Sequence, residues 1–260
     1  MSGAAIQTYS MTQRHVRAFL RQPWFLVIAL TQPVIWLLLF GALFKNVTEI
    51  PGFAAAGSSY LDYLMPGVIV MTALFSSGWS GMGIIEDIDR GIMDRFLVAP
   101  VHRGSLIAGR DVADALTLLI QALIMGGLAL VLGAHFASGV AGFAILAVAA
   151  LLLGMSFGSV SNALALVVRQ RESVIGINTL LVLPATFLSA AFMPLSLVPD
   201  WIATIARFNP VNWAVEAGRA GLAADLDWSF ILPRLSALLI LDVVCMWLAT
   251  RAFRSYQRSV

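Results

Sequence analysis

The chain has 260 residues, of which 60% are hydrophobic and only 12% are charged, and its formal net charge is +2. A soluble domain carries about 25% charged residues, so this composition excludes an ordinary soluble protein. Apolar runs of about 20 residues recur along the chain, and each is long enough to cross a ~30 Å hydrocarbon core as an α-helix. The sequence therefore predicts an all-α membrane protein in which residues 1–260 form a single transmembrane domain.

Six apolar runs are predicted to cross the membrane. They are Trp24–Phe44, Tyr63–Ile85, Ile107–Leu132, Val140–Val168, Ser173–Phe192 and Ile231–Thr250. Ahead of the first run, residues 6–22 place apolar and basic side chains at helical spacing, and Pro23 ends this pattern. Such a segment is typical of an amphipathic helix that lies on the membrane surface with its arginines near lipid headgroups.

The distribution of basic residues predicts the orientation. An even number of spans places both termini on the same side of the membrane. Twelve of the sixteen Lys and Arg residues fall on that side, whereas the other side holds Lys45, Arg207, Arg219 and Arg234. Because cytoplasmic loops carry the excess of basic residues, both termini are predicted to be cytoplasmic, in a multi-pass protein of the plasma (inner) membrane.

Residues 193–222, between the fifth and sixth runs, are predicted to lie on the outer side. Three prolines interrupt this segment, namely Pro194, Pro199 and Pro210. Trp201, Ile205 and Phe208 recur at helical spacing, and a second amphipathic stretch follows. The segment is too broken to span, which favours two short re-entrant helices in the outer leaflet, held by interfacial tryptophan. An ordinary extracellular loop is the alternative.

A charged loop, EDIDRGIMDRFLVAPVHRG at residues 86–104, follows the second run. Ile88, Ile92 and Phe96 recur every four residues and form the apolar stripe of a short amphipathic helix. A helix that binds lipid alone would be dominated by Lys and Arg, whereas acidic residues balance the arginines here. Mixed charge around an apolar stripe favours a groove on a cytoplasmic protein, with a solvated turn as the alternative.

Several segments, taken together, resemble the permease subunit of an ATP-binding-cassette exporter of the second type, and the daunorubicin-resistance-like drug exporters fit best. The segments follow the family's order along nearly the whole chain, on a six-span plan. They are RQPWFLVIALTQPVIWLLLFGALF at 21–44, DIDRGIMDRFLVAPVHRGSLIAGRDVAD at 87–114 and FLSAAFMPLSLVPDWIATIARFNPVNWAVEAGR at 187–219.

The resemblance implies roles for two sets of residues. It makes the loop at 86–104 a coupling helix seated in a groove of a cytoplasmic ATPase, with the helix at 6–22 bracing that interface. The implied coupling residues are Asp87, Arg90, Gly91, Asp94, Arg95, Phe96 and Leu97. The outer helices would close the extracellular face, and their family motif falls on Asn209, Pro210, Glu216 and Arg219.

The ATPase itself is predicted to be a separate subunit. A phosphate-binding loop needs the pattern Gly-x-x-x-x-Gly-Lys-Ser/Thr, and the only lysine of this chain, Lys45, stands in GALFKNVT. We therefore expect a transport subunit rather than an enzyme, with no cofactor of its own and with ATP and Mg on the partner. By the resemblance, two permeases, as a homodimer or heterodimer, would assemble with two ATP-binding subunits in the lipid, without nucleic acid.

The implied function is the export of an amphiphilic drug, lipid or lipid-linked glycan. In this family the first, second and fifth spans border the central path, so aromatic residues on them are candidates for its lining. These candidates are Trp36, Phe40, Phe75, Trp79 and Phe187. Contact with lipid or simple helix packing is the alternative for each of them.

Asp242 lies inside the last predicted run, about 12 Å from its start. A carboxylate at such a depth usually faces protein or water. It would contact a proton or substrate, or else pack as a neutral or hydrogen-bonded group against neighbours such as Gln121 or Asn162. The alternative function is a stand-alone ion-coupled carrier that uses Asp242, although the sequence lacks a convincing internal repeat.

The stretch GMSFG at residues 154–158 has two interpretations. As a GxxxG motif it permits two helices to approach closely. As Gly-x-Ser-x-Gly it matches a hydrolase pattern, which needs a strand–turn–helix setting and a histidine base. The stretch lies in the middle of a predicted span, and the three histidines are scattered at membrane edges, which argues against both a hydrolase and a metal site.

Overall fold

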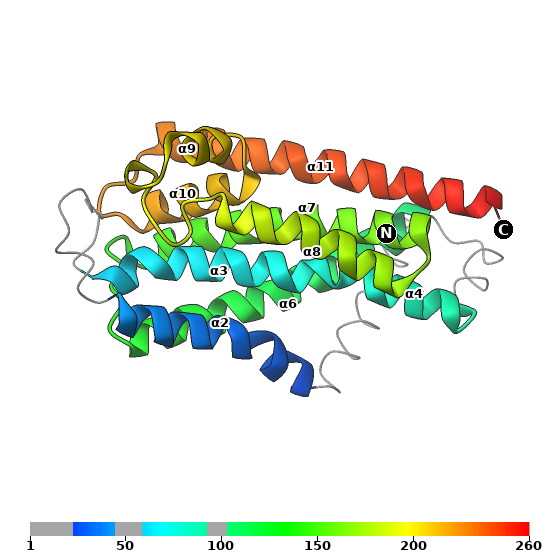
Figure 1. Cartoon of the computed structure of the whole chain (residues 1–260), viewed down its shortest axis with the longest axis horizontal. Coiled ribbons are helices and arrows are strands. Elements are labelled where there is room, and N and C mark those ends of the chain that lie inside the picture. The colour runs from blue at the N-terminus through cyan, green and yellow to red at the C-terminus, as the bar shows by residue number, and fades with distance from the viewer. Residues whose placement is uncertain (1–22, 45–58, 93–102, 260) are drawn as a thin grey trace, which may run out of the picture.

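The computed structural model describes residues 23–44, 59–92 and 103–259. Long helices run side by side along one axis, and the short helices α9 and α10 gather at one end (Figure 1). The described elements are α2 (Pro23–Leu43), α3 (Tyr60–Gly78), α4 (Ser80–Asp89), α6 (Arg103–Val131), α7 (Gly139–Val168), α8 (Arg171–Phe187), the 3₁₀ turn η2 (Leu195–Leu197), α9 (Asp200–Ala206), α10 (Pro210–Leu222) and α11 (Trp228–Ser259). The helical class predicted from composition is confirmed for this part of the chain.

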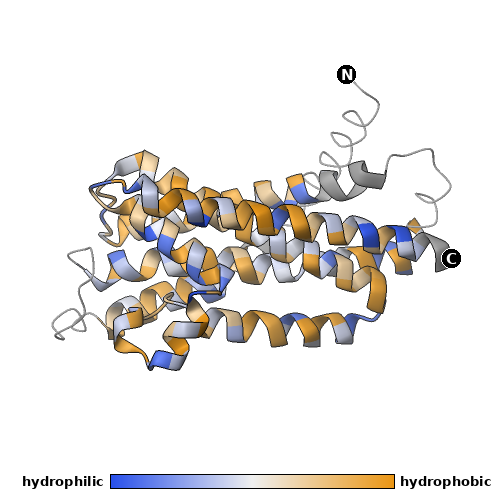
Figure 2. Cartoon of the chain, turned by 90° about the horizontal axis from the view of Figure 1, so that it is seen from above, coloured by the Kyte–Doolittle hydropathy of each residue, from blue (hydrophilic) through white to orange (hydrophobic). Residues whose placement is uncertain are grey.

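Within the described residues, four helical rods are long and apolar enough to cross a membrane. They are Tyr60–Asp89, Asp111–Val131, Gly139–Val168 and Trp228–Tyr256. α2 contributes a shorter apolar stretch, Val27–Leu43, and α8 has 17 residues. Hydrophobic residues dominate the length of these rods (Figure 2), so the chain is a multi-pass membrane protein.

The predicted C-terminal ends of the fifth and sixth runs differ from the ends of the observed helices. The fifth run was expected to continue to Phe192, but α8 ends at Phe187, three residues after Pro184. The last run was expected to end at Thr250, but α11 has 32 residues and continues to Ser259. At 1.5 Å per residue α11 is about 48 Å long, which exceeds the ~30 Å core, because its polar last turns need no hydrocarbon to remain helical.

The second predicted run, Tyr63–Ile85, is not one regular helix. α3 ends at Gly78 and α4 begins at Ser80, with Trp79 between them. α4 then continues to Asp89, where Arg90 caps it and Gly91 adopts a positive φ of 64°. The predicted continuous stripe through Ile88 and Ile92 is therefore wrong, because Ile88 belongs to α4 and the left-handed turn at Gly91 reorients the chain before Ile92.

α7 is the central helix of the bundle and packs against α3, α4, α6, α10 and α11. GMSFG lies at a helix contact: a Cβ at Gly154 would lie 2.4 Å from Leu118 Cδ1 on α6 and 3.5 Å from the carbonyl oxygen of Ala73 on α3. Ser156, inside the same motif, is 1% exposed, and its hydroxyl donates to Leu152 O of its own helix at 2.8 Å. The motif thus serves helix packing.

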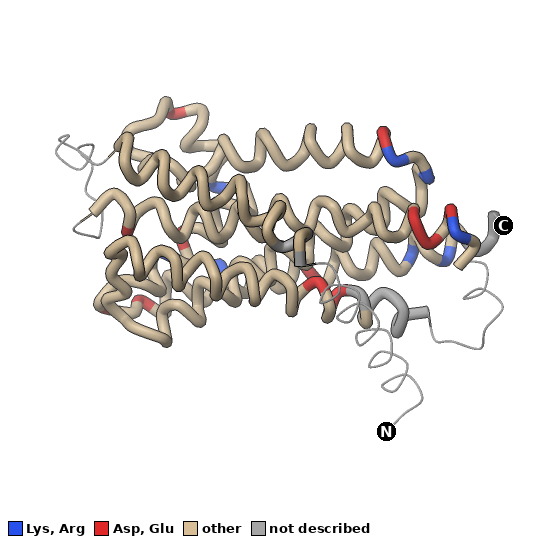
Figure 3. The backbone as a smooth tube through the Cα atoms, turned by 90° about the horizontal axis from the view of Figure 1, so that it is seen from below, with Lys and Arg blue, Asp and Glu red and all other residues tan. Residues whose placement is uncertain are grey.

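Charged residues gather toward the two ends of the bundle and are most numerous at the end where the C-terminus lies (Figure 3). At that end Arg171 of α8 contacts Asp89 of α4 at 3.1 Å, and the guanidinium of Arg169 lies 4.5 Å from the ring centre of Tyr256 on α11. The opposite end holds α9 and α10 (Figure 1). The bundle is therefore polarised along its axis, as the sequence predicts.

Candidate functional site

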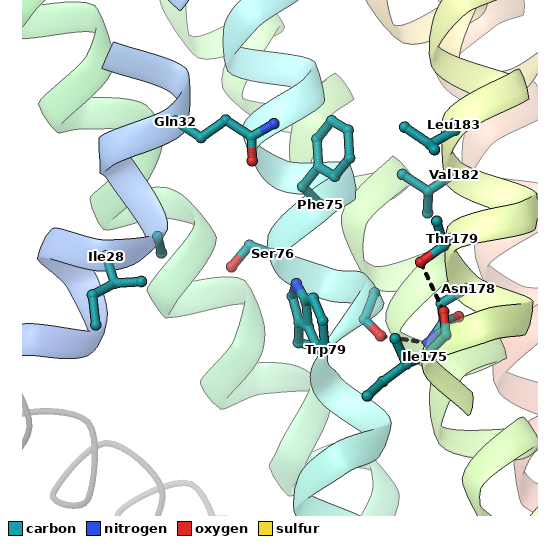
Figure 4. Close-up of a pocket in the computed structure, with 12 residues that line it drawn as sticks. Ile28, Gln32, Phe75, Ser76, Trp79, Ile175, Asn178, Thr179, Val182 and Leu183 are labelled. Carbon is teal, nitrogen blue, oxygen red and sulfur yellow. Dashed lines mark hydrogen bonds between the residues drawn. The ribbon is translucent and has the colours of Figure 1, made fainter. Parts of the chain in front are cut away.

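A cavity of about 430 Å³ lies between α2, α3 and α8. These are the helices of the first, second and fifth predicted runs, the ones expected to border the path. Its labelled lining residues converge from the three helices on one space (Figure 4). The lining consists of Ile28, Ala29, Gln32, Phe75, Ser76, Gly78, Trp79, Ile175, Asn178, Thr179, Val182 and Leu183.

The lining combines aromatic surface with uncharged polar groups. Phe75 and Trp79 present rings on the α3 side, and Asn178 and Thr179 present an amide and a hydroxyl from α8 (Figure 4). Gln32 adds a second amide from α2. A mostly apolar wall with a few hydrogen-bonding groups suits a molecule that has both a hydrophobic body and polar substituents.

The predicted aromatic residues fall in two places. Phe75 and Trp79 line the cavity itself, whereas Trp36 lines a small adjoining space of about 30 Å³ together with Phe75. The rings of Trp36 and Phe75 are 6.4 Å apart. Phe40 and Phe187 line neither space. Phe40 contacts Trp36 directly, with ring centres 5.8 Å apart, whereas Phe187 reaches Trp36 through a further aromatic residue.

That further residue is Phe192, which is not among the residues predicted from the sequence. Its ring centre lies 5.2 Å from that of Trp36, 5.6 Å from Phe40 and 5.9 Å from Phe187. Gln32 and Asn178 are absent from the predicted set as well. The sequence signal for Gln32 and Asn178 is an amide side chain within an apolar run, which is costly in a membrane unless it faces protein, water or a ligand.

The motif at 209–219 closes the end of α8. Beyond Phe187 the chain leaves the helix, so its carbonyl groups need other donors. Asn209 Nδ2 donates to Ala185 O at 2.6 Å and to Leu188 O at 2.7 Å. Its Oδ1 accepts from Val211 N at 2.9 Å and caps α10, with Pro210 at the first helical position. One side chain therefore both starts α10 and fixes it to the end of α8.

Arg219 completes this closure from the other end of α10. Its Nη2 donates to Tyr63 O and to Ala191 O, each at 3.1 Å, and its guanidinium lies 3.5 Å from the ring centre of Tyr63. Burial lowers the pKa of Arg219, and the neighbouring Tyr63 and Glu216 oppose that shift. Arg219 thus holds α3, α10 and the chain after α8 together.

Glu216, the acidic member of the motif, contacts α11. Arg234 Nε donates to Glu216 Oε2 at 2.7 Å. The side chains are 22% exposed for Glu216 and 25% exposed for Arg234, so the ion pair is only partly screened by solvent. Together the four motif residues tie α10 to its surroundings, which is a structural role at the end of the bundle that carries α9 and α10.

The predicted coupling residues are only partly within the described structure. Asp87 lies in the last turn of α4, Arg90 caps that helix and Gly91 makes the turn after it. Arg90 also pairs with Glu86 one turn back, at 2.5 Å on an exposed surface. Asp94, Arg95, Phe96 and Leu97, as well as the amphipathic helix predicted at 6–22, lie outside the described residues.

Asp242 on α11 is 5% exposed. The predicted neighbours Gln121 and Asn162 bond elsewhere, since Gln121 Nε2 donates to Ser76 Oγ and Asn162 Oδ1 accepts from Ser80 Oγ. Among the described residues, Asp242 Oδ1 has no hydrogen-bond partner. In the same part of the chain, no three His, Cys, Asp or Glu side chains come together to hold a metal ion.

The fold and the cavity define a class of protein: a multi-pass helical membrane protein with a cavity between its helices. Comparison with known families is more specific. Residues 6–223 match the ABC-2 type transporter family. The chain belongs to this family, and the predicted resemblance is confirmed.

Several named relatives are similar to most of the chain. The daunorubicin resistance ABC transporter permease protein DrrB1 of Streptomyces coeruleorubidus is 28% identical over 216 residues, covering 83% of this chain and 75% of the relative. A probable doxorubicin resistance ABC transporter permease protein, DrrC of Mycobacterium tuberculosis, is 24% identical over 253 residues, covering 97% and 89%. A putative transport permease, ycf38 of Cyanophora paradoxa, is 30% identical over 214 residues, covering 81% and 71%.

Proposed function

We propose that this chain is the membrane-spanning subunit of an ATP-driven exporter that moves an amphiphilic drug, lipid or lipid-linked glycan out of the cell. The observation that carries the proposal is the cavity between α2, α3 and α8 in a chain that matches the ABC-2 type transporter family. ATP and Mg would bind a separate subunit. Two permeases and two ATP-binding subunits would form the working complex.

The proposed topology has six spans and cytoplasmic termini in the inner membrane. It is supported by the charges at the C-terminal end of the bundle and by the short helices at the other end (Figure 3). In this arrangement the chain after α4 faces the ATP-binding subunit. α9 and α10 would lie at the outer leaflet, where the exposed rings of Trp201 and Phe208 suit a membrane interface.

In the proposed mechanism, closure of the ATP-binding subunits pushes on the segment at 86–104. α4 begins beside the cavity and ends at this segment, so a displacement there reaches the cavity through one short helix. The cavity would then alternate between a closed state and a state open to the outside, and release its contents outward.

The test is purification of the chain from its own host, followed by reconstitution in lipid vesicles with whatever ATP-binding subunit co-elutes. Daunorubicin serves as the transport probe, because the name of the Streptomyces coeruleorubidus relative refers to daunorubicin resistance. We expect vanadate-sensitive, ATP-dependent movement of the probe across the membrane. Absence of an ATP-binding subunit from the purified assembly would contradict the proposal.

A second candidate function is an ion-coupled carrier that uses Asp242, and the carboxylate oxygen that lacks a partner within the described residues favours it. This candidate requires that the chain alone transports the probe when a proton gradient is imposed. It also requires that Asp242→Asn abolishes this transport. ATP-dependent transport that continues in Asp242→Asn would exclude it.

A further inference from the structure

A break separates α3 from α4 beside the cavity. In a regular helix Met82 N would donate to Gly78 O, but it donates to Trp79 O at 3.0 Å. The carbonyl group of Gly78 is thus released from the helix. It accepts instead from Ser161 Oγ on α7 at 2.7 Å and from Asn178 Nδ2 on α8 at 2.6 Å.

Ser161 also serves the other side of the break. Gly81 N donates to Ser161 Oγ at 3.1 Å, and Asn178 Nδ2 lies 3.0 Å from the same oxygen. Ser161 is fully buried. We call this group of Gly78, Gly81, Ser161 and Asn178 the latch. It satisfies both backbone groups that the break exposes, which is required where water is scarce.

The backbones pack too closely at this point for the latch to slip. A Cβ at Gly81 would lie 2.4 Å from the carbonyl oxygen of Ser161. α4 therefore touches α7 without an intervening side chain. A change in the angle between α3 and α4 must therefore move the groups that the latch holds together, because the atoms have no room to adapt.

The latch lies between the cavity and the charged end of α4. Gly78 and Asn178 both line the cavity, and Trp79 lies between the two helices (Figure 4). At its other end α4 contacts α8 directly, through Asp89 and Arg171 at 3.1 Å. α4 and α8 are therefore connected at two levels, by this ion pair and, through Ser161 of α7, by the latch. The ion pair of Asp89 and Arg171 is exposed to solvent and contributes little to stability, so the buried latch dominates the connection between α4 and α8.

We propose that Ser161 and Asn178 are positioning residues that transmit movement of α4 to the cavity wall on α8. The proposal rests on the proposed function, because it takes the force on α4 to come from an ATP-binding subunit. A push at the segment after α4 changes the α3–α4 angle. The latch then moves Asn178, and with it the part of α8 that faces the bound molecule.

Two pairs of variants separate the latch from ordinary packing. Ser161→Ala removes the hydroxyl that bridges Gly78 and Gly81, and its control is Ser156→Ala, which removes an equally buried hydroxyl on the same helix that bonds only within α7. Asn178→Leu removes the amide, and its control is Thr186→Val on the same helix. Thr186 does not line the cavity, and its hydroxyl donates to Val182 O of α8 at 2.8 Å.

The first readout is hydrogen–deuterium exchange of the purified complex with and without vanadate-trapped nucleotide, which needs no transported molecule. In the parent complex we expect trapping to change exchange in peptides covering 79–82 and 176–183 together. In Ser161→Ala and Asn178→Leu the change at 79–82 should persist while the change at 176–183 is lost. Retention of both changes in these variants, as in the controls, would overturn the proposal.

The second readout is the amount of ATP hydrolysed per molecule of daunorubicin moved. Loss of one buried hydrogen bond between α4 and α8 changes an equilibrium constant by about tenfold. We therefore expect the ratio of ATP hydrolysed to daunorubicin moved to rise by about tenfold in the latch variants and to stay unchanged in the controls. Asn178→Gln retains an amide donor, so it should raise this ratio less than Asn178→Leu does. An equal ratio in latch and control variants would contradict the latch. Failure of the parent complex to trap nucleotide would instead contradict the proposed function.

Discussion

At the scale of single residues, Asn209 has two separable tasks. Its Oδ1 caps α10, and its Nδ2 donates to two carbonyl groups at the end of α8. Both groups of bonds are intramolecular and buried or partly buried. Because this one side chain ties together the backbones of two helices, Asn209 should matter for stability more than for transport chemistry.

We predict that Asn209→Ala lowers the stability of the folded chain by roughly 2–4 kcal/mol, because it removes a helix cap and two hydrogen bonds. Asn209→Asp keeps the capping oxygen and loses the two donors, so its effect should be intermediate. Thermal unfolding in detergent, followed by circular dichroism, measures both. Equal stability of Asn209→Asp and Asn209→Ala would show that the cap contributes nothing.

We expect the side chain of Trp79 to contact aromatic ligands that bind in the cavity. Its side chain lines the cavity and is 52% exposed. Loss of an aromatic contact reduces affinity by about tenfold, so we predict that Trp79→Ala weakens binding of daunorubicin by about that factor. Quenching of the drug's own fluorescence by the purified chain measures the dissociation constant.

The control for Trp79 is Trp247→Ala. Trp247 is similarly exposed, at 58%, but it lies on α11, away from the cavity lining. Its replacement should leave the dissociation constant unchanged. The same loss of affinity in both variants would mean that the drug partitions onto the apolar surface of the protein rather than into the cavity.

At the scale of helices, α10 shows how a broken segment becomes an ordered element. The prolines of residues 193–222 prevent a long helix, and the structure instead has the turn η2 and the helices α9 and α10. α10 packs against α3, α7 and α11. Carbonyl groups at and after the end of α8 accept from side chains of α3 and from residues 209–219, which explains why the chain can leave the helix there.

The segment after α4 is the element on which the proposed coupling depends. We predict that reversing the charge at Asp94 or Arg95 leaves insertion into the membrane intact and uncouples ATP hydrolysis from transport, because these residues would face the ATP-binding subunit. The measurement is ATP hydrolysis and daunorubicin transport by the same reconstituted sample. Normal transport by these variants would refute the assignment of this segment.

At the scale of the whole molecule, the asymmetry of charge along the bundle predicts its orientation. α11 is suited to test it because exposed residues stand close to both of its ends. The chain has one native cysteine, Cys245, which is buried. New cysteines at exposed positions can therefore be labelled against a low background.

We predict that Asp225→Cys, before α11, reacts with a membrane-impermeant maleimide added to intact cells. Ser255→Cys, near the other end of α11, should react only after the membrane is permeabilised, because the positive-inside rule places that end in the cytoplasm. The parent chain is the control for Cys245. Reaction of Ser255→Cys in intact cells would reverse the proposed orientation.

The helical class, the places of the apolar helices and the polarity of the ends follow from the sequence itself. Apolar runs of sufficient length have no stable form in a membrane other than hydrogen-bonded helices, so composition and spacing decide this much. The family resemblance likewise rests on sequence alone, since DIDRGIMDRFLVAP and the Asn209–Arg219 motif are local patterns of residues.

Only the tertiary structure shows where those helices are interrupted and which hydrogen bonds satisfy the backbone groups exposed at each interruption. Nothing in Gly78, Trp79 and Ser80 predicts that α3 ends there, because the released carbonyl is stabilised by Ser161 and Asn178, which lie 83 and 100 residues away in the chain. The same holds for the chain at the end of α8, whose carbonyl groups depend on Asn209 and Arg219. A helix break is stable only where other helices supply the missing hydrogen bonds, and local sequence carries no record of those partners.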